Sequence, residues 1–450
     1  MAAEKGRLRR EISLLTLVSI SAGSVIGGWV AEAPYWFKTT GAGSALLFPV
    51  LAILLTPVGL AIAEMTSMMP VTAGPLAFTT LALGRGAAFW THWMFFLVQV
   101  IEPPLISFIF ATIVAYFTGT SSFLLVKLLT VGFLLIWFVI TMYNIGFIGK
   151  IANVLFVVMI AGSIVVGVTF FASGHWTMAN VTGSGGWFPG GWYGAMIGMA
   201  VLVLKYIGFE LVPSLSEEVN FPKQDFWKAI LSALIIPGVL YAFAVLAMAG
   251  MAPWQTIASW DLPEARIVTM YKLPNIIALV ALGAGILHAI TTMAGFWLSS
   301  ARALYGFSQL GFLPKALLKT NSKGQPWIAN IVVLALSLFF VLWTPTAWVQ
   351  YTYSVSCVAG GILYFILMID FWVLRKRFPD RERPYRAPGG FLGFAVGALI
   401  SIWIVVGSLL ELPPAGYYSF GIFILIGIVV WLVGRKYQRE GRWQSEIELS

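Results

Sequence analysis

Charged residues are scarce in this sequence. Asp, Glu, Lys and Arg make up only 10% of its 450 residues, whereas 59% are hydrophobic. A soluble domain carries about 25% charged residues, so a monomeric water-soluble fold is excluded. The mean hydropathy of +0.89 instead predicts a polytopic membrane protein that has the lipid bilayer as its partner.

Cysteine and histidine are nearly absent as well. The single cysteine, Cys357, excludes an intrachain disulfide. His92, His175 and His288 are scattered, and no His-x-x-x-His, Asp-Asp-x-x-Asp or Gly-x-Ser-x-Gly pattern lies at a membrane face. The sequence therefore predicts no metal site, no cofactor and no enzymatic activity. A channel is the other rival class, and it would need a repeated pore loop or a ring-forming oligomer. The oligomeric state stays open.

Apolar segments separated by polar or Gly/Pro-rich connections divide the chain into twelve predicted transmembrane helices, because about 20 apolar residues cross a bilayer. Their limits, set to within several residues, are 12–38, 43–69, 87–117, 123–142, 148–172, 190–213, 227–250, 275–308, 327–343, 346–373, 391–410 and 416–434. The predicted fold class is therefore all-α.

Basic residues outside these segments are distributed asymmetrically. Nearly all lie at the two termini and in the loops after even-numbered segments, and only Lys38, Lys127, Arg266 and Lys272 lie on the other side. Because cytoplasmic loops carry an excess of Lys and Arg, this pattern predicts a plasma-membrane protein with both termini in the cytoplasm. The net charge of +9 is thus a topology signal and an attraction to anionic lipid, and it does not indicate nucleic-acid binding.

Two segments are interrupted by poor helix formers. Residues 21–29 read Ser-Ala-Gly-Ser-Val-Ile-Gly-Gly-Trp, and residues 204–213 contain a Lys, a Gly, a Glu and a Pro. Unpaired backbone groups are tolerated in a membrane only where they line a polar cavity or meet a ligand. The alternative for the first segment is a close helix contact at Gly23 and Gly27. Matched breaks five segments apart favour two inverted repeats of five helices with discontinuous first helices.

The domain organisation follows from these breaks. We expect a cytoplasmic N-terminus (1–11), a first repeat (12–172), a second repeat (190–373), two additional helices (391–434) and a cytoplasmic C-terminus (435–450). Two inverted halves in one chain favour alternating access over a channel.

Four motifs, in this order, resemble those of the amino acid–polyamine–organocation (APC) transporter superfamily. Residues 23–29 resemble Gly-Ala-Ile-Ile-Gly-Ser/Thr-Gly-Ile-Phe, and residues 206–210, Tyr-Ile-Gly-Phe-Glu, resemble Phe-x-Gly-Phe-Glu. The others are residues 217–230 (Glu-Glu-x-x-Asn-Pro-Lys…Ala-Ile) and residues 300–330 (Ser-Arg-x-Leu-Tyr…Gly-x-Leu-Pro…Thr-Pro). The sequence departs from the pattern at Trp29, Lys205 and Leu310. The resemblance implies a secondary transporter of amino acids.

The resemblance also implies a zwitterion site between the two breaks, because a helix N-terminus attracts a carboxylate and unpaired carbonyls attract an ammonium. It implies that the amides of Gly27, Gly28 and Trp29 hold the carboxylate, and that the carbonyls of Val25, Leu204 and Ile207 hold the ammonium. The side-chain candidates are Gln99, Glu102, Tyr206, Phe209, Phe296, Tyr351 and Ser354. For each aromatic residue, ordinary packing is the alternative.

Lys205 is an ionisable residue inside an apolar segment, where charge is expensive and usually functional. We expect it to respond to protons or to contact substrate, with Glu102 or Glu210 as its partner and as further proton-coupling candidates. A structural ion pair is the alternative. If Lys205 neutralises Glu102, a neutral amino acid is the expected substrate. If Glu102 is unpaired, a polyamine or a cationic amino acid is expected instead.

Charged residues near the predicted cytoplasmic ends indicate an inner gate closed by ion pairing between Glu217, Glu218 and Arg302. Solvated loop charges are the alternative. Sodium coupling would need the hydroxyls of Thr291, Thr292, Ser299 and Ser300. Hydroxyls are common in any helix, so we favour proton coupling, exchange or facilitated transport. We expect segments 1, 2, 6 and 7 to rock against the rest.

Overall fold

The computed structural model describes residues 8, 10–119, 122–143, 145–183 and 185–446. Parts of both predicted cytoplasmic termini, residues 1–7, 9 and 447–450, lie outside the described residues, and with them the basic Lys5, Arg7 and Arg9. Within the described ranges the regular structure is helical, and strand-like pairing is confined to two isolated bridges. The all-α prediction is confirmed.

Each predicted transmembrane segment coincides with one helix or with a broken run of helices. They are α1 (Leu14–Ile26) with α2 (Trp29–Thr40), α3 (Ser44–Met68), α5 (Arg85–Thr118), α6 (Phe123–Ile140), α7 (Ile145–Ala172), α9 (Gly191–Leu202) with the 3₁₀ turns η2 (Val203–Tyr206) and η3 (Phe209–Glu218), α10 (Phe226–Ala249), α13 (Asn275–Gln309), α14 (Trp327–Trp343), α15 (Trp348–Arg377), α16 (Gly390–Leu410) and α17 (Pro414–Arg439). Among the described residues, ten helical stretches are long and apolar enough to cross a membrane, and α1 and α14 are shorter apolar helices.

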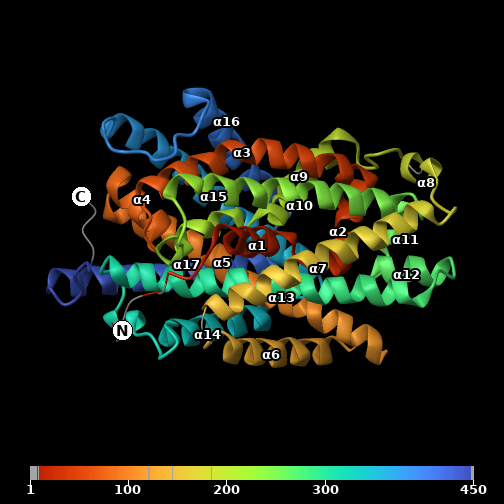
Figure 1. Ribbon diagram of the computed structural model, residues 1–450, viewed down its shortest axis with the longest axis horizontal. Helices are drawn as coiled ribbons and strands as arrows, with labels where there is room; N and C mark the ends of the chain where they lie inside the picture. Colours follow the sequence, from red (N-terminus) through yellow and green to blue (C-terminus); the bar gives the residue numbers. More distant parts are fainter. Residues whose placement is uncertain (1–7, 9, 120–121, 144, 184, 447–450) are drawn as a thin grey trace.

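Several connections that the sequence left irregular form short helices. These are α4 (Gly74–Leu83), α8 (Met178–Thr182), α11 (Trp254–Ala258), α12 (Pro263–Met270), η1 (Gly41–Gly43), η4 (Lys223–Asp225) and η5 (Lys315–Leu318). The long helices run along the longest axis of the molecule, with α4 and the C-terminal part of α17 at one end and α8, α11 and α12 at the other (Figure 1). We call these the α4 end and the α12 end.

Two glycines with left-handed backbone conformations make the two breaks. Gly27, between α1 and α2, has φ 55°, and Gly208, between η2 and η3, has φ 129°, a region that side-chain-bearing residues rarely adopt. A Cβ atom at Gly27 would lie 2.2 Å from Nζ of Lys205, and one at Gly208 would lie 3.0 Å from Val25. The two breaks therefore face each other inside the bundle. The packing alternative applies to Gly23, whose Cβ would lie 3.3 Å from Thr291.

The broken first helix lies in the interior of the bundle. In Figure 1, α1 is at the centre, and it packs against α7, α10, α13 and η3. By contrast, α6, α16 and α17 expose large apolar side chains such as Leu124, Leu399 and Val429, as expected of helices that face lipid. The division into two inverted repeats stays a prediction, but its two breaks lie where the sequence placed them.

Candidate functional site

A buried ion pair joins the two breaks. Nζ of Lys205, in η2, donates a hydrogen bond to Oε2 of Glu32, in the first turn of α2, at 2.6 Å, and both residues are buried. The expectation that Glu102 or Glu210 would be the direct partner of Lys205 was wrong. Glu32 takes this place because α2 restarts at Trp29, which brings its first turn beside η2.

This ion pair is incompletely satisfied. Oε1 of Glu32 has no hydrogen-bond partner among the described residues. The ammonium also lies near the rings of Trp36 and Tyr241, at 5.8 and 5.6 Å from Nζ to the centroids. Glu102, from α5, interacts electrostatically with Lys205 and accepts a hydrogen bond from Ser356 at 3.1 Å. We call Lys205, Glu32, Glu102 and Glu210 the central cluster.

Glu210 differs from the other acids of the central cluster because the protein satisfies both of its oxygens. Its Oε1 accepts from Gln99 at 2.9 Å, and its Oε2 accepts from the Tyr364 hydroxyl and the Gly208 amide, each at 2.9 Å. Gln99 and Glu210, both predicted site residues, thus tie α5 and α15 to the second break. This arrangement holds the break open rather than leaving a free carboxylate.

Three of the six predicted backbone ligands already have protein partners. The Gly27 amide donates to Oγ1 of Thr292 at 3.1 Å, and the Val25 carbonyl accepts from the Tyr241 hydroxyl at 2.5 Å. The Leu204 carbonyl accepts from the Ile207 amide at 3.0 Å. Gly28 is the N-cap of α2 and Trp29 its first residue. The amides of a first helical turn have no partner within the helix, so this turn directs partial positive charge at the break.

The side chain of Trp29 points to the α12 end. Its indole donates to Oε1 of Glu264, in α12, at 3.1 Å, and its ring lies 4.5 Å from that of His288. Burial raises the pKa of Glu264 to about 7, and the hydrogen bond from the indole opposes this rise. Trp29, the bulky residue that replaces a motif glycine, therefore links the first break to the short helix α12.

Three of the remaining aromatic candidates lie around the second break. The Tyr206 hydroxyl donates to the carbonyl of Phe48, and Phe209 stacks on Tyr364 with 5.3 Å between centroids. Phe296, from α13, would lie 3.5 Å from a Cβ atom at Gly208. Their contacts are those of packed residues next to the central cluster.

Two predicted residues on α15 point elsewhere. The Tyr351 hydroxyl pairs with Ser419 of α17 at 2.9 Å, and the Ser354 hydroxyl donates to the carbonyl of Glu411 at 3.2 Å. Besides Tyr364, two other α15 residues reach the site, each two positions further on: Ser356 donates to Glu102, and Tyr353 accepts from the Trp36 indole at 2.7 Å. Because each residue turns a helix by about 100°, an offset of two positions moves a side chain to another face.

The predicted inner gate lies at the α4 end. Arg302 binds Glu218 through two parallel bonds, Nε to Oε1 at 2.9 Å and Nη2 to Oε2 at 3.1 Å, and its Nη1 donates to Gln325 at 3.0 Å. Glu217 is not part of this pair, since it accepts from the Thr72 amide at 2.7 Å and from a Gln309 amide. The ion pair between Glu218 and Arg302 is confirmed, and solvated loop charge is wrong for Glu218, which is 1% exposed.

The hydroxyls considered for sodium bond to the protein. Thr292 donates to the Gly23 carbonyl at 3.0 Å, and Thr291 reaches the same oxygen at 3.4 Å. Ser299 accepts from Ser214, and Ser300 donates to the Phe296 carbonyl. Thr291 and Thr292 therefore join α13 to the last turn of α1. No group of three or more metal-ligating side chains occurs within the ranges that the structure describes.

Sequence reasoning missed Glu32 and Tyr241 as members of the site. Glu32 carried a usable signal, because a carboxylate in an apolar segment has the same functional weight as Lys205. Tyr241 carried none, since 15% of the residues are aromatic and its hydroxyl reaches the break only through the packing of α10 against α1.

Residues 12–431 match the family model described as amino acid permease. The chain belongs to the amino acid permease family. The permease is thus a multi-pass membrane transporter of the amino acid class and not an enzyme.

Individual relatives are distant but extend over most of the chain. The permease is 25% identical to the branched-chain amino acid permease BcaP of Lactococcus lactis subsp. cremoris, with 92% of each chain covered. It is 24% identical to the methylthioribose transporter of Bacillus subtilis, over 96% of this chain and 94% of the relative. A D-serine/D-alanine/glycine transporter of Escherichia coli is 25% identical over 52% of this chain and 51% of the relative.

Proposed function

We propose that the permease binds a zwitterionic amino acid by opening the pair between Lys205 and Glu32. The substrate carboxylate replaces Glu32 on the Lys205 ammonium and meets the amides of the first turn of α2. The substrate ammonium meets the carboxylate of Glu32. The observation that carries this proposal is that Oε1 of Glu32 accepts no hydrogen bond from a described residue, in a pair that lies against Gly27 at the break.

The physical argument rests on how buried charges are compensated. An uncompensated buried charge costs several kcal/mol, so a buried pair cannot simply separate. A zwitterion supplies one partner of each sign, and both charges therefore stay paired when the substrate inserts between them. An uncharged solute would leave both Lys205 and Glu32 unpaired, which disfavours it.

The transport cycle follows from the two ends of the bundle. Release toward the α4 end requires the bonds between Arg302 and Glu218 to break, and access from the α12 end requires Trp29 and Glu264 to separate. The basic loops support placing the α4 end in the cytoplasm of a plasma-membrane protein. If transport is coupled to protons, Lys205 and Glu102 are the residues that bind and release them in this proposal.

A second candidate substrate class has its own observation. The central cluster contains three carboxylates and one ammonium, and Glu102 accepts a single side-chain hydrogen bond, from Ser356. A cationic substrate, such as a polyamine or a cationic amino acid, would add the missing positive charge there. The zwitterionic class needs both Glu32 and Lys205, whereas the cationic class needs Glu102.

A ligand screen by thermal stability separates these candidates, because a ligand selective for the native state stabilises it by mass action. The detergent-purified permease is heated with neutral amino acids, with arginine, and with putrescine or spermidine. We expect stabilisation by neutral amino acids that is lost in Lys205→Gln and Glu32→Gln and kept in Glu102→Gln. Stabilisation by amines alone, lost in Glu102→Gln, would replace the proposal with the cationic class.

A further inference from the structure

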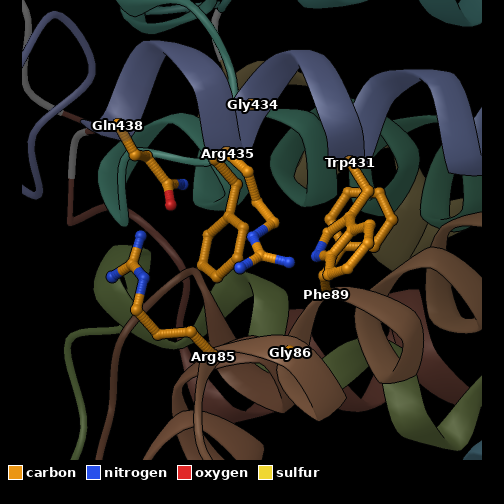
Figure 2. Close-up of a pocket in the computed structure, with 8 residues that line it drawn as sticks. Arg85, Gly86, Phe89, Trp431, Gly434, Arg435 and Gln438 are labelled. Carbon is orange, nitrogen blue, oxygen red and sulfur yellow. The ribbon is translucent and has the colours of Figure 1, made fainter. Parts of the chain in front are cut away.

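A surface pocket at the α4 end contains two arginines and no acidic residue. It lies between the start of α5, the C-terminal part of α17 and the loop after α13, and it has a volume of about 340 Å³. Figure 2 shows that Arg85 enters this space from α5 and Arg435 enters it from α17. The remaining walls include Gly86, Phe312, Trp431 and Gln438. We call it the basic pocket.

Each guanidinium of the basic pocket rests on an aromatic ring. The Arg85 guanidinium lies 4.3 Å from the Phe312 centroid and donates to the Leu310 carbonyl at 2.8 Å. The Arg435 guanidinium lies 4.8 Å from the Trp431 centroid. Stacking occupies the faces of a guanidinium and leaves its N–H edge available, which is the edge that binds phosphate oxygens in pairs.

No described carboxylate forms an ion pair with an arginine of the basic pocket. Glu440 nearby instead pairs with Arg442 at 3.7 Å. Two cations that share one small pocket repel each other. An anion bound between them would remove this repulsion.

The position of the basic pocket relative to the apolar surface of α17 indicates the source of the anion. Exposed apolar residues continue along α17 through Leu425, Val429 and Val433. Basic residues begin directly afterwards, at Arg435 and Lys436. The basic pocket therefore opens where the apolar surface ends, which is the level of lipid headgroups, and basic pockets between helices at this level bind anionic headgroups.

We propose that the basic pocket binds the phosphate group of an anionic phospholipid. Arg85 and Arg435 hold the phosphate oxygens, and the Gln438 side chain, whose amide donates to the Gly311 carbonyl at 2.6 Å, lies beside them. Bound lipid joins α5 to α17 and thereby fixes the last helix of the chain against the bundle. Free inorganic phosphate has the same chemistry, so the experiment must separate the two sources.

The test compares lipid-dependent stability of the full chain in detergent. Phosphatidylglycerol, phosphatidylcholine or sodium phosphate is added, the melting temperature is measured, and retained lipids are counted by native mass spectrometry. We expect phosphatidylglycerol to raise the melting temperature by several degrees and one retained lipid to be lost in Arg85→Gln/Arg435→Gln. The matched control is Lys319→Gln/Lys323→Gln, which removes two exposed charges from a loop after α13 and should keep both responses.

A second variant keeps the charges and fills the space. A Cβ atom at Gly86 would meet nothing within 4 Å, so Gly86→Leu should fold normally, occupy the pocket and lose the same lipid. An equal response to phosphatidylglycerol in the wild type and in both pocket variants would overturn the site. Full stabilisation by sodium phosphate alone, with displacement of the retained lipid, would overturn the assignment to a phospholipid.

Discussion

Two buried ion pairs of the permease, Arg302 with Glu218 and Lys205 with Glu32, differ in how completely the protein satisfies them. At the α4 end, Arg302 and Glu218 share two parallel bonds, and Gln325 takes a third guanidinium nitrogen. At the breaks, Lys205 and Glu32 share one bond, and one oxygen of Glu32 has no partner within the described part of the chain. The first pair, the closed pair, is fully hydrogen-bonded, whereas the second, the open pair, leaves one carboxylate oxygen without a hydrogen bond from a described residue.

This difference assigns the pairs to different tasks. A bidentate guanidinium pair fixes geometry as well as charge, which suits a contact that must hold one end of the bundle shut. An ammonium is a point charge on a flexible stem, and the binding mode that we propose uses this flexibility to let Lys205 turn from Glu32 to a substrate carboxylate. Glu264 is a third case, since its buried carboxyl is held by an indole and no cation.

The largest expected effect is on stability at the closed pair. Glu218→Gln leaves the Arg302 guanidinium buried without a countercharge, and breaking a buried pair in this way costs about 3–5 kcal/mol. Thermal unfolding in detergent measures the loss. Glu217→Gln is the matched control, because Glu217 forms no pair with Arg302. Equal melting temperatures for the two variants would remove the distinction between a closed pair and an open one.

The pH dependence of stability tests the carboxyl group of Glu264, which is hydrogen-bonded to the Trp29 indole and forms no ion pair with a described residue. The pKa of Glu264 is raised by burial to about 7 in the folded protein, whereas an unfolded Glu titrates near 4.3. The folded state therefore holds this proton more tightly, so its stabilisation is complete below about pH 4.3 and is lost as pH rises toward 7. The loss is on the order of 3 kcal/mol.

Glu264→Gln keeps an acceptor for the Trp29 indole and cannot ionise. Its melting temperature should fall less than that of the wild type between pH 5 and pH 8. Glu382→Gln, at an exposed loop position, serves as the control and should follow the wild type. A wild-type slope in Glu264→Gln would show that another group carries the pH dependence.

The open pair is tested by affinity rather than by stability. Glu32→Gln removes the charge that would hold the substrate ammonium, and hydrogen bonds to charged groups contribute about 1.5–3 kcal/mol. Substrate affinity should therefore fall about 10- to 100-fold. A substrate titration of the thermal shift measures this change, with Glu102→Gln alongside. Unchanged affinity in Glu32→Gln would mean that the pair is a structural one.

The smallest expected effect concerns the backbone of the first break. Gly27 has φ 55° and ψ −169°, a conformation that essentially only glycine adopts, so Gly27→Ala costs about 1–3 kcal/mol in backbone strain and directs a side-chain carbon at Lys205. Gly283→Ala on α13, where a Cβ meets nothing within 4 Å, is the control and should be neutral or stabilising. If Gly27→Ala binds substrate and melts like Gly283→Ala, the break does not need this glycine.

The sequence predicted features that depend on local pattern. Apolar runs located the spans, and the glycines at 27 and 208 located the breaks, because both signals are read from adjacent residues. The partner of Lys205 could not be read this way, since it depends on where α2 restarts and how its first turn faces η2. Tyr351 and Ser354 failed for a related reason, because only packing decides which face of α15 lines the site. Residues 74–83, apolar but too short to span, became the helix α4.

One further contact connects the two broken helices mechanically. The amide of Ile12, just before α1, donates to the carbonyl of Glu218, and the amide of Asn220 donates to the carbonyl of Ile12, each at 2.9 Å. Backbone hydrogen bonds therefore join the residue before α1 to the end of η3, which follows the second break. A movement of Glu218 away from Arg302 is expected to be transmitted to residue 12. We therefore expect the start of α1 and the end of η3 to move as one unit during the transport cycle.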